Sequence, residues 1–233
     1  MIRRKQQQTS HSDSNSGFTI IESLVAIVVV SILLAAIAPV IVLSTATRVQ
    51  AKRIELASQA AKTFIDGVIT GSITTPDVVD TLSVPTTGSP RNITATPGDY
   101  LVNTTKMPAP TSATGLYCLR KDNVISNIST DCADINNINF FVQAGRIEVV
   151  SAGINDGYRL AIRVYRGDVA FGNSSNPILV SQGNTKNQAS VMTGGLGNKQ
   201  APLVEMTTDV STRFTSFQAF CKRLGAAPGR TCQ

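Results

Sequence analysis

The pattern of hydrophobic and polar positions changes once within the first seventy residues. Residues 23–47 contain no ionisable side chain, and a helix needs about 20 apolar residues to cross a bilayer. From Arg48 the pattern becomes amphipathic, with apolar side chains at three- and four-residue steps. It predicts one long helix over residues 18–70, of which 18–47 suit lipid or a helical bundle. The apolar positions of the second half are Ile54, Ala57, Ala61, Phe64, Ile65 and Val68.

The remaining chain has the pattern of a β-rich head over residues 100–233. It is preceded by a Thr/Pro/Ser-rich connection, residues 71–99, with a short strand expected near 78–84. We predict an α+β fold in which the second half of the long helix packs on an antiparallel β-sheet of about four strands. The predicted strands are 115–121, 138–144, 146–152 and 158–166, with 177–182 as a candidate fifth and the tail from 212 as a strand or short helix.

The clearest alternation is "YRLAIRVYR", residues 158–166. Its even-numbered residues from Tyr158 to Val164 are apolar or aromatic, so we expect one face toward a core and the other toward water or a partner. Arg159, Arg163 and Arg166 would then form a basic stripe on the outer face. That stripe has two interpretations, a solvated strand face or a contact with an acidic polymer such as an acidic polysaccharide.

Composition argues against several classes of function. His11 is the only histidine, and it precedes the apolar run. If the leader is removed, a Ser-His-Asp triad, a Cys-His pair and a His-ligated metal are all excluded. Residues 1–17 carry three basic side chains and one acidic, leaving 18 basic and 14 acidic. This small, scattered excess gives no reason to expect nucleic acid, and we expect neither an enzyme nor a cofactor.

All four cysteines lie in the C-terminal half: Cys118, Cys132, Cys221 and Cys232. An even number suits disulfides in an oxidising compartment. Three connectivities are possible, and we favour local pairing, Cys118 with Cys132 and Cys221 with Cys232, because it closes short loops. Buried free thiols are the alternative. A Cys₄ zinc site is disfavoured because no C-x-x-C spacing is present.

The segment "TDCADINN", residues 130–137, gathers carboxylate and amide oxygens. Calcium prefers such ligands, but the spacing does not match an EF-hand loop. A polar turn and a calcium site both remain open from the sequence, and we expect no metal.

Glu22 is the one carboxylate close to the apolar run, five residues into "GFTIIESLVAI", residues 17–27. An acidic side chain inside a membrane helix costs about 2.5–3.5 kcal/mol on insertion scales. Such a residue is therefore a functional candidate that needs a partner.

This segment resembles the class III signal of type IV pilins and pseudopilins. The resemblance implies a leader, residues 1–17, cut between Gly17 and Phe18 by a prepilin peptidase. It also implies N-methylation of Phe18, an assembly role for Glu22 and a helix kink at Pro39. The matched features are the basic leader, Gly, Phe, Glu, the uncharged run and Pro. In an assembled bundle, Glu22 would meet the terminal amine of a neighbouring subunit.

The resemblance implies a structural subunit, a pseudopilin or minor pilin, held in the inner membrane by residues 18–47. Its head would be periplasmic, and its partners would be other pilins or pseudopilins and an inner-membrane assembly platform. Residues 17–67 look most like the cyanobacterial hormogonium polysaccharide secretion pseudopilins, which implies export of an extracellular polysaccharide. The alternative is a membrane-anchored adhesin or carbohydrate-binding module that uses a pilin anchor.

Overall fold

The structure is a computed structural model of the 233-residue chain. It describes residues 17, 19–89, 91, 96–99, 102, 104–127, 130–182, 185–187, 189 and 197–225. The chain divides into two compact units, and the division falls after Thr45, within the first helix.

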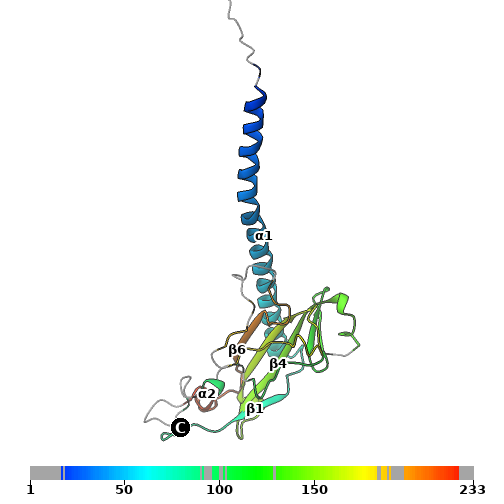
Figure 1. Cartoon of the computed structure of the whole chain (residues 1–233). Coiled ribbons are helices and arrows are strands. Elements are labelled where there is room, and N and C mark those ends of the chain that lie inside the picture. Colours follow the sequence, from blue (N-terminus) through cyan, green and yellow to red (C-terminus); the bar gives the residue numbers. More distant parts are fainter. Residues whose placement is uncertain are drawn as a thin grey trace, which may run out of the picture. The chain divides into compact units, whose positions relative to one another are not determined.

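The elements confirm the predicted α+β fold class, a long N-terminal helix packed against a largely antiparallel sheet (Figure 1). The helices are α1 Ile20–Thr70 and α2 Phe217–Leu224, with short 3-10 turns η1 Pro97–Asp99, η2 Ile135–Asn137 and η3 Ile154–Asp156. The strands are β1 Val78–Leu82, β2 Tyr117–Arg120, β3 Ile125–Ser126, β4 Ile138–Val149, β5 Tyr158–Arg166 and β6 Val204–Val210.

Helix α1 ends where the sequence predicts. Gly71 has φ +77°, a conformation that glycine adopts without a steric penalty, and its N–H donates to the Val68 carbonyl. Within the second unit, the buried face of α1 is made mainly of small residues, three alanines and a glycine, so the helix can approach the sheet closely. This face contains Gln50, Ala57, Ala60, Ala61, Phe64, Gly67 and Val68.

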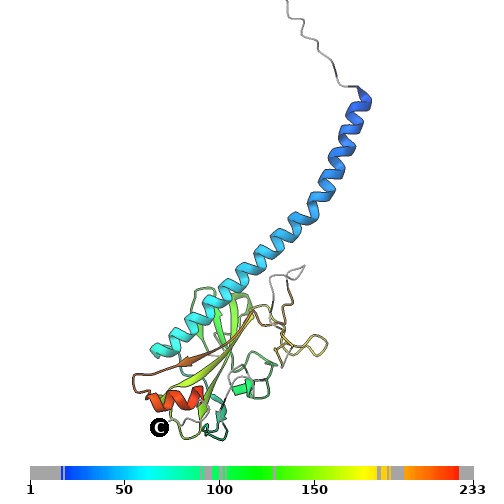
Figure 2. The ribbon, with the colours of Figure 1, turned by 90° about the vertical axis from the view of Figure 1, so that its left-hand side faces the viewer.

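The second half of α1 lies against the sheet (Figure 2), and its buried face packs on one face of β5. Leu160, Ile162 and Val164 are fully buried in the same core cluster as Phe64. The Phe64 ring meets the Tyr117 ring edge-on, with centroids 4.7 Å apart, a favoured geometry for aromatic pairs. The predicted core face of the helix and of β5 is therefore correct.

The sheet has the order β3-β2-β4-β5-β6, and its neighbouring strands are antiparallel. β1 pairs with β4 in parallel, on the edge that β2 also uses. The first part of β4 pairs with β2 and its last part with β1.

The prediction of separate strands at 138–144 and 146–152 is wrong, because both belong to β4. Gly145 separates the two predicted strands in the sequence, but it lies in the middle of β4. A Cβ on Gly145 would lie 2.6 Å from the Val79 methyl groups and 3.2 Å from the Met107 sulfur. Glycine is present there because β1 and the Met107 loop pack close to the strand.

Two further strand predictions need correction. Residues 177–182 form no strand of the sheet, although Ile178 is buried and the Leu179 N–H donates to Gln200. The strand β6 was not predicted, because its sequence, "VEMTTDV", carries little apolar alternation. The tail contains the short helix that was one of its two predicted forms.

Cys118 and Cys132 form a disulfide, as local pairing predicts. It closes a loop with a sequence separation of 14 residues, for which the loop-entropy model gives about 3 kcal/mol. Cys221 is also disulfide-bonded, but Cys232 lies outside the described residues. The pairing of Cys221 with Cys232 therefore stays a prediction.

The buried tyrosines predict a loss of stability at alkaline pH. Burial raises the pKa of Tyr165 above its ordinary value of 10; Arg163 opposes this shift and Glu205 adds to it. Burial also raises the pKa of Tyr117 and Tyr158. The folded chain keeps these protons at pH values where the unfolded chain releases them. These tyrosines should therefore leave the free energy of unfolding independent of pH below about pH 10, and they should make it fall as the pH rises above that value.

Urea unfolding of the detergent-solubilised chain at a series of pH values tests this. Tyr165→Phe should fall less steeply than wild type above about pH 10, by up to about 1.4 kcal/mol per pH unit. Near neutral pH the variant should lose only the contribution of one hydrogen bond, about 1 kcal/mol, which Tyr165 donates to the Leu179 carbonyl. Identical alkaline slopes in the two proteins would contradict the prediction.

Candidate functional site

The start of α1 contains the residues with predicted roles in processing and assembly. Thr19 Oγ1 accepts a hydrogen bond from the Glu22 N–H at 3.2 Å, and the Thr19 carbonyl accepts one from the Ser23 N–H. Thr19 therefore caps the helix, and "TIIE" has the Ser/Thr-x-x-Glu spacing of a capping box. The sequence pattern could have revealed this cap, but we did not predict it.

Its position gives Glu22 a second, local role. A carboxylate in the first turn of a helix interacts favourably with the helix dipole. The Glu22 side chain is exposed, and within the part of the chain that the structure describes it forms no ion pair. Its charge is therefore accessible to a group from another molecule.

Gly17 is exposed, and no atom lies within 4 Å of the position that a Cβ would take. Its backbone is accessible to a protease in this structure. Phe18, the predicted new N-terminus, lies outside the described residues. The cleavage and methylation of this junction therefore stay predictions.

The first unit of the chain contains a segment that suits an apolar environment. Its most apolar 18-residue window has a mean hydropathy of 3.1 and no buried residue, and α1 is long and apolar enough to span a membrane. The hydroxyls of Ser23, Ser31 and Thr45 bond to carbonyls one turn back, at 2.8, 2.7 and 2.9 Å. Such internal bonds lower the cost of placing hydroxyl groups in lipid.

Pro39 lies inside α1, and the residues on both sides of it are helical. Proline has no N–H, so the Ala35 carbonyl lacks its usual donor at this position. The kink that the resemblance implies at Pro39 stays a prediction.

Comparison with protein families identifies the N-terminal segment. Residues 13–38 match the model of the prokaryotic N-terminal methylation motif. The chain carries a type IV pilin-like signal. The matched range includes Gly17, Phe18 and Glu22 and ends one residue before Pro39. No curated protein and no solved structure matches the chain significantly.

The motif supports a pilin-like or pseudopilin-like structural subunit that is processed by prepilin peptidase and assembles with other pilins. Together with the apolar part of α1, it is consistent with membrane anchoring.

The head of this pilin-like chain does not expose the predicted basic stripe. Arg159 is 4% exposed and Arg163 is fully buried. The stripe prediction is wrong because both faces of β5 are covered. α1 covers the even-numbered side chains from Tyr158 to Val164, while loops and α2 cover the odd-numbered ones. Arg166, at the end of the strand, is half-buried and pairs with Asp168 at 2.6 Å.

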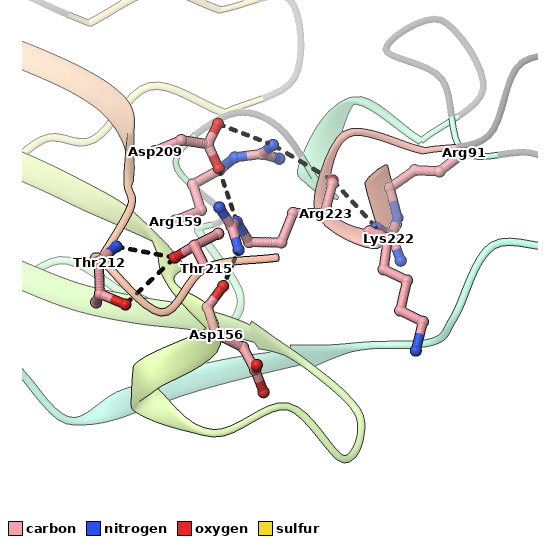
Figure 3. Close-up of polar contacts among 8 residues, drawn as sticks. All are labelled: Arg91, Asp156, Arg159, Asp209, Thr212, Thr215, Lys222 and Arg223. Carbon is pink, nitrogen blue, oxygen red and sulfur yellow. Dashed lines mark hydrogen bonds and ion pairs between the residues drawn. The ribbon is translucent and has the colours of Figure 1, made fainter. Parts of the chain in front are cut away.

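Arg159 and Arg223 share the carboxylate of Asp209 (Figure 3). The Arg159 Nη2 and Arg223 Nε atoms lie 3.4 and 3.3 Å from its two oxygens. Arg91 donates to the carbonyls of Lys222 and Arg223, and Arg159 donates to the latter. These carbonyls belong to the last turn of α2, where the helix dipole favours cations. The cluster therefore fixes α2 to the sheet.

Arg163 joins three strands in one row across the same sheet face. It lies between its cross-strand neighbours Gln143 on β4 and Glu205 on β6. Its Nε donates to Glu205 Oε1 at 3.0 Å, and its Nη1 donates to Gln143 Oε1 and to the Met107 carbonyl. Burial lowers the pKa of Arg163, while Tyr165 and Glu205 oppose that shift. Arg163 thus holds the Met107 loop against the sheet.

The acidic segment 130–137 forms a turn. Asp134 caps η2 by accepting from the Asn136 N–H, and Asp131 accepts from the Ser126 hydroxyl. Among the residues described, no three or more His, Cys, Asp or Glu side chains lie close enough to hold a metal ion.

Arg163 and Arg166 provide a matched test of the buried face. Arg163→Ala leaves Glu205 buried without its charge partner, so it should lower the free energy of unfolding by about 3–5 kcal/mol. Arg166→Ala removes a pair from the same strand whose carboxylate, on Asp168, is exposed, and should cost less than about 1 kcal/mol. Urea unfolding of the detergent-solubilised chains measures both values. Equal, small losses would mean that Arg163 is solvated, as the stripe prediction assumed.

Proposed function

We propose that this protein is a pseudopilin or minor pilin, a structural subunit of a type IV pilus-like or type II secretion-like filament. One observation carries the proposal. The methylation motif at residues 13–38 leads directly into an exposed apolar helix. Such a helix needs lipid or other helices around it, and a filament core supplies the latter.

In this proposal, residues 1–17 are the leader and residues 18–47 hold the subunit in the inner membrane before assembly. Residues 48–70 connect this anchor to a periplasmic head, residues 100–233, through the connection 71–99. The amphipathic second half of α1 supports this division, because one of its faces is buried against the head.

Glu22 acts in this proposal as the docking charge. Cleavage after Gly17 creates an ammonium at Phe18, and Glu22 of one subunit pairs with the ammonium of its neighbour. An unpaired charge is costly in a low-dielectric bundle, and a paired one much less so. The cost of an unpaired charge therefore favours the one axial offset between neighbouring helices at which Glu22 meets the ammonium. The exposure of Glu22, and the absence of an ion pair with it among the described residues, support this role.

The exported material in this proposal is an extracellular polysaccharide. The support is the resemblance of residues 17–67 to the hormogonium polysaccharide secretion pseudopilins. An acidic polysaccharide would have to contact the head elsewhere than at Arg159 and Arg163, because both are buried.

Mass spectrometry of the membrane-extracted protein tests the processing step. It should detect a chain that begins with N-methyl-Phe18. An intact Met1 terminus, or cleavage after the apolar run, would refute the proposal.

Glu22→Gln tests the docking charge. Glutamine also fits the capping box, so the variant removes the charge and leaves the cap possible. Insertion and cleavage should survive, while filament incorporation should fall because the neighbour's ammonium loses its partner, at a cost of about 3–5 kcal/mol per contact. Quantitative blotting of membrane and sheared-filament fractions measures the two pools.

Two variants serve as controls. Thr19→Ala removes the cap at a cost of about 1 kcal/mol and keeps the charge, so its product should still assemble. Glu22→Asp keeps the charge on a shorter side chain and should assemble better than the Gln variant. Normal assembly of Glu22→Gln would mean that Glu22 is not the docking charge.

A further inference from the structure

One edge of β4 has a gap in its pairing. β2 pairs as far as Val142, and β1 begins pairing at Arg146. The Arg146 N–H donates to the Asp77 carbonyl on this edge, whereas the Asn139 carbonyl accepts from Gly167 on the β5 side. Alternate residues of a strand direct their N–H and C=O groups to opposite edges. Ala144 therefore faces the gap.

The backbone of Ala144 has no partner at this edge. Within the described residues, neither its N–H nor its C=O forms a backbone hydrogen bond outside the strand ladders, and neither β1 nor β2 pairs with it. On the β5 side, Ala144 lies opposite Ile162. The N–H and C=O of Ile162 face β6 instead, as the Val164 carbonyl does when it accepts from the Leu203 N–H. One donor and one acceptor are thus left open in the middle of a sheet.

A cavity of about 510 Å³ lies at this gap, a volume typical of small-molecule sites. Gln143 and Ala144 line it from β4, Val79 lines it from β1, and residues 106–117 supply most of the remaining wall. Asp77, Lys106 and Asn127 add polar groups. The cavity therefore offers several hydrogen-bonding groups beside apolar surface.

The wall is fixed by buried interactions. The Gln143 amide accepts from Arg163 and donates to the Pro108 carbonyl at 2.7 Å. Arg163 also donates to the Met107 carbonyl. The Tyr117 hydroxyl donates to the Thr74 carbonyl at 3.2 Å. A site whose walls are held in this way is preformed, which reduces the entropy lost on binding.

We propose that this cavity binds a sugar residue of a neutral polysaccharide through two adjacent hydroxyl groups. The N–H and C=O of one extended residue point the same way and lie side by side. One sugar hydroxyl accepts from the Ala144 N–H, and its neighbour donates to the Ala144 C=O. A secondary amide in the trans form cannot make both bonds, because its N–H and C=O point in opposite directions.

A peptide strand fits the gap less well. β-strand addition needs a run of open backbone groups along an edge. Here β1 and β2 occupy the edge on both sides, and of the described residues between them only Ala144 is open. The binding step depends on the head alone, but its meaning as cargo recognition rests on the proposed export function.

The test uses the full, detergent-solubilised chain and neutral oligosaccharides of glucose, galactose and mannose. Hydrogen–deuterium exchange should slow at the Ala144 amide with at least one of them, because this N–H has no partner among the described residues. The same oligosaccharide, after periodate cleavage of its adjacent hydroxyls and borohydride reduction, should give no protection. No protection by any member of the series, or equal protection by the cleaved sugar, would overturn the proposal.

Ser112→Trp supplies the matched variant. Ser112 is exposed and lines the cavity, so an indole there should obstruct the site and lower the sugar affinity by about tenfold or more, the equivalent of about 1.4 kcal/mol. Ser211→Trp places the same group at an exposed position that does not line the cavity and should bind normally. Equal affinity of both variants would count against the site.

The experiments distinguish a failure of the filament function from a failure of the sugar site. Ser112→Trp protein should still be cleaved after Gly17 and should still enter filaments. A chain that is not processed but binds the sugar would refute the filament function and leave the binding site standing. A processed, assembling chain that binds no sugar would refute the site alone.

Discussion

The head depends on the contact between the alanine-rich face of α1 and the central strand β5. Ala57 and Ala61 have short side chains, so Phe64 and the side chains of β5 can fill the space between helix and sheet. This contact buries Leu160, Ile162 and Val164 completely. One face of β5 is thus buried by α1. The opposite face could be either solvated or covered, and in this fold loops and α2 cover it.

Covering the second face explains the arginines. A charged side chain on a buried strand is tolerated only when it is paired and hydrogen-bonded. Arg159 meets this condition through Asp209 and the last turn of α2, and Arg163 meets it through Glu205, Gln143 and a loop carbonyl. Arg159 thereby helps to fix the short helix α2 to the sheet, and Arg163 fixes the Met107 loop. The gap beside Ala144 and its cavity lie along this same face, and Arg163 holds part of the cavity wall.

The N-terminal segment depends on a different constraint, the need of an apolar helix for an apolar environment. Among the described residues, no residue in the most apolar window of α1 is buried, and the hydroxyls of the run bond inside the helix. Glu22 belongs to the first turn, where the cap at Thr19 and the helix dipole stabilise it locally. Stabilising the first turn of the helix leaves the Glu22 carboxylate charged and exposed, so it can also pair with a group of another subunit. The methylation motif supports a pilin-like subunit for reasons independent of the head.

The sequence by itself determined the features that depend on neighbouring residues. Gly71 ended the helix, the spacing of Ala57, Ala61 and Phe64 defined its buried face, and "GFTIIE" carried the signal. Only the tertiary structure decided which faces are buried. Alternation cannot distinguish an arginine in water from one that meets a distant carboxylate, such as Asp209, because that pairing joins residues far apart in sequence. For the same reason the sequence pattern divides β4 at Gly145, since the close approach of Val79 and Met107 is a long-range contact. The gap at Ala144 likewise exists only because two separate strands stop on either side of it.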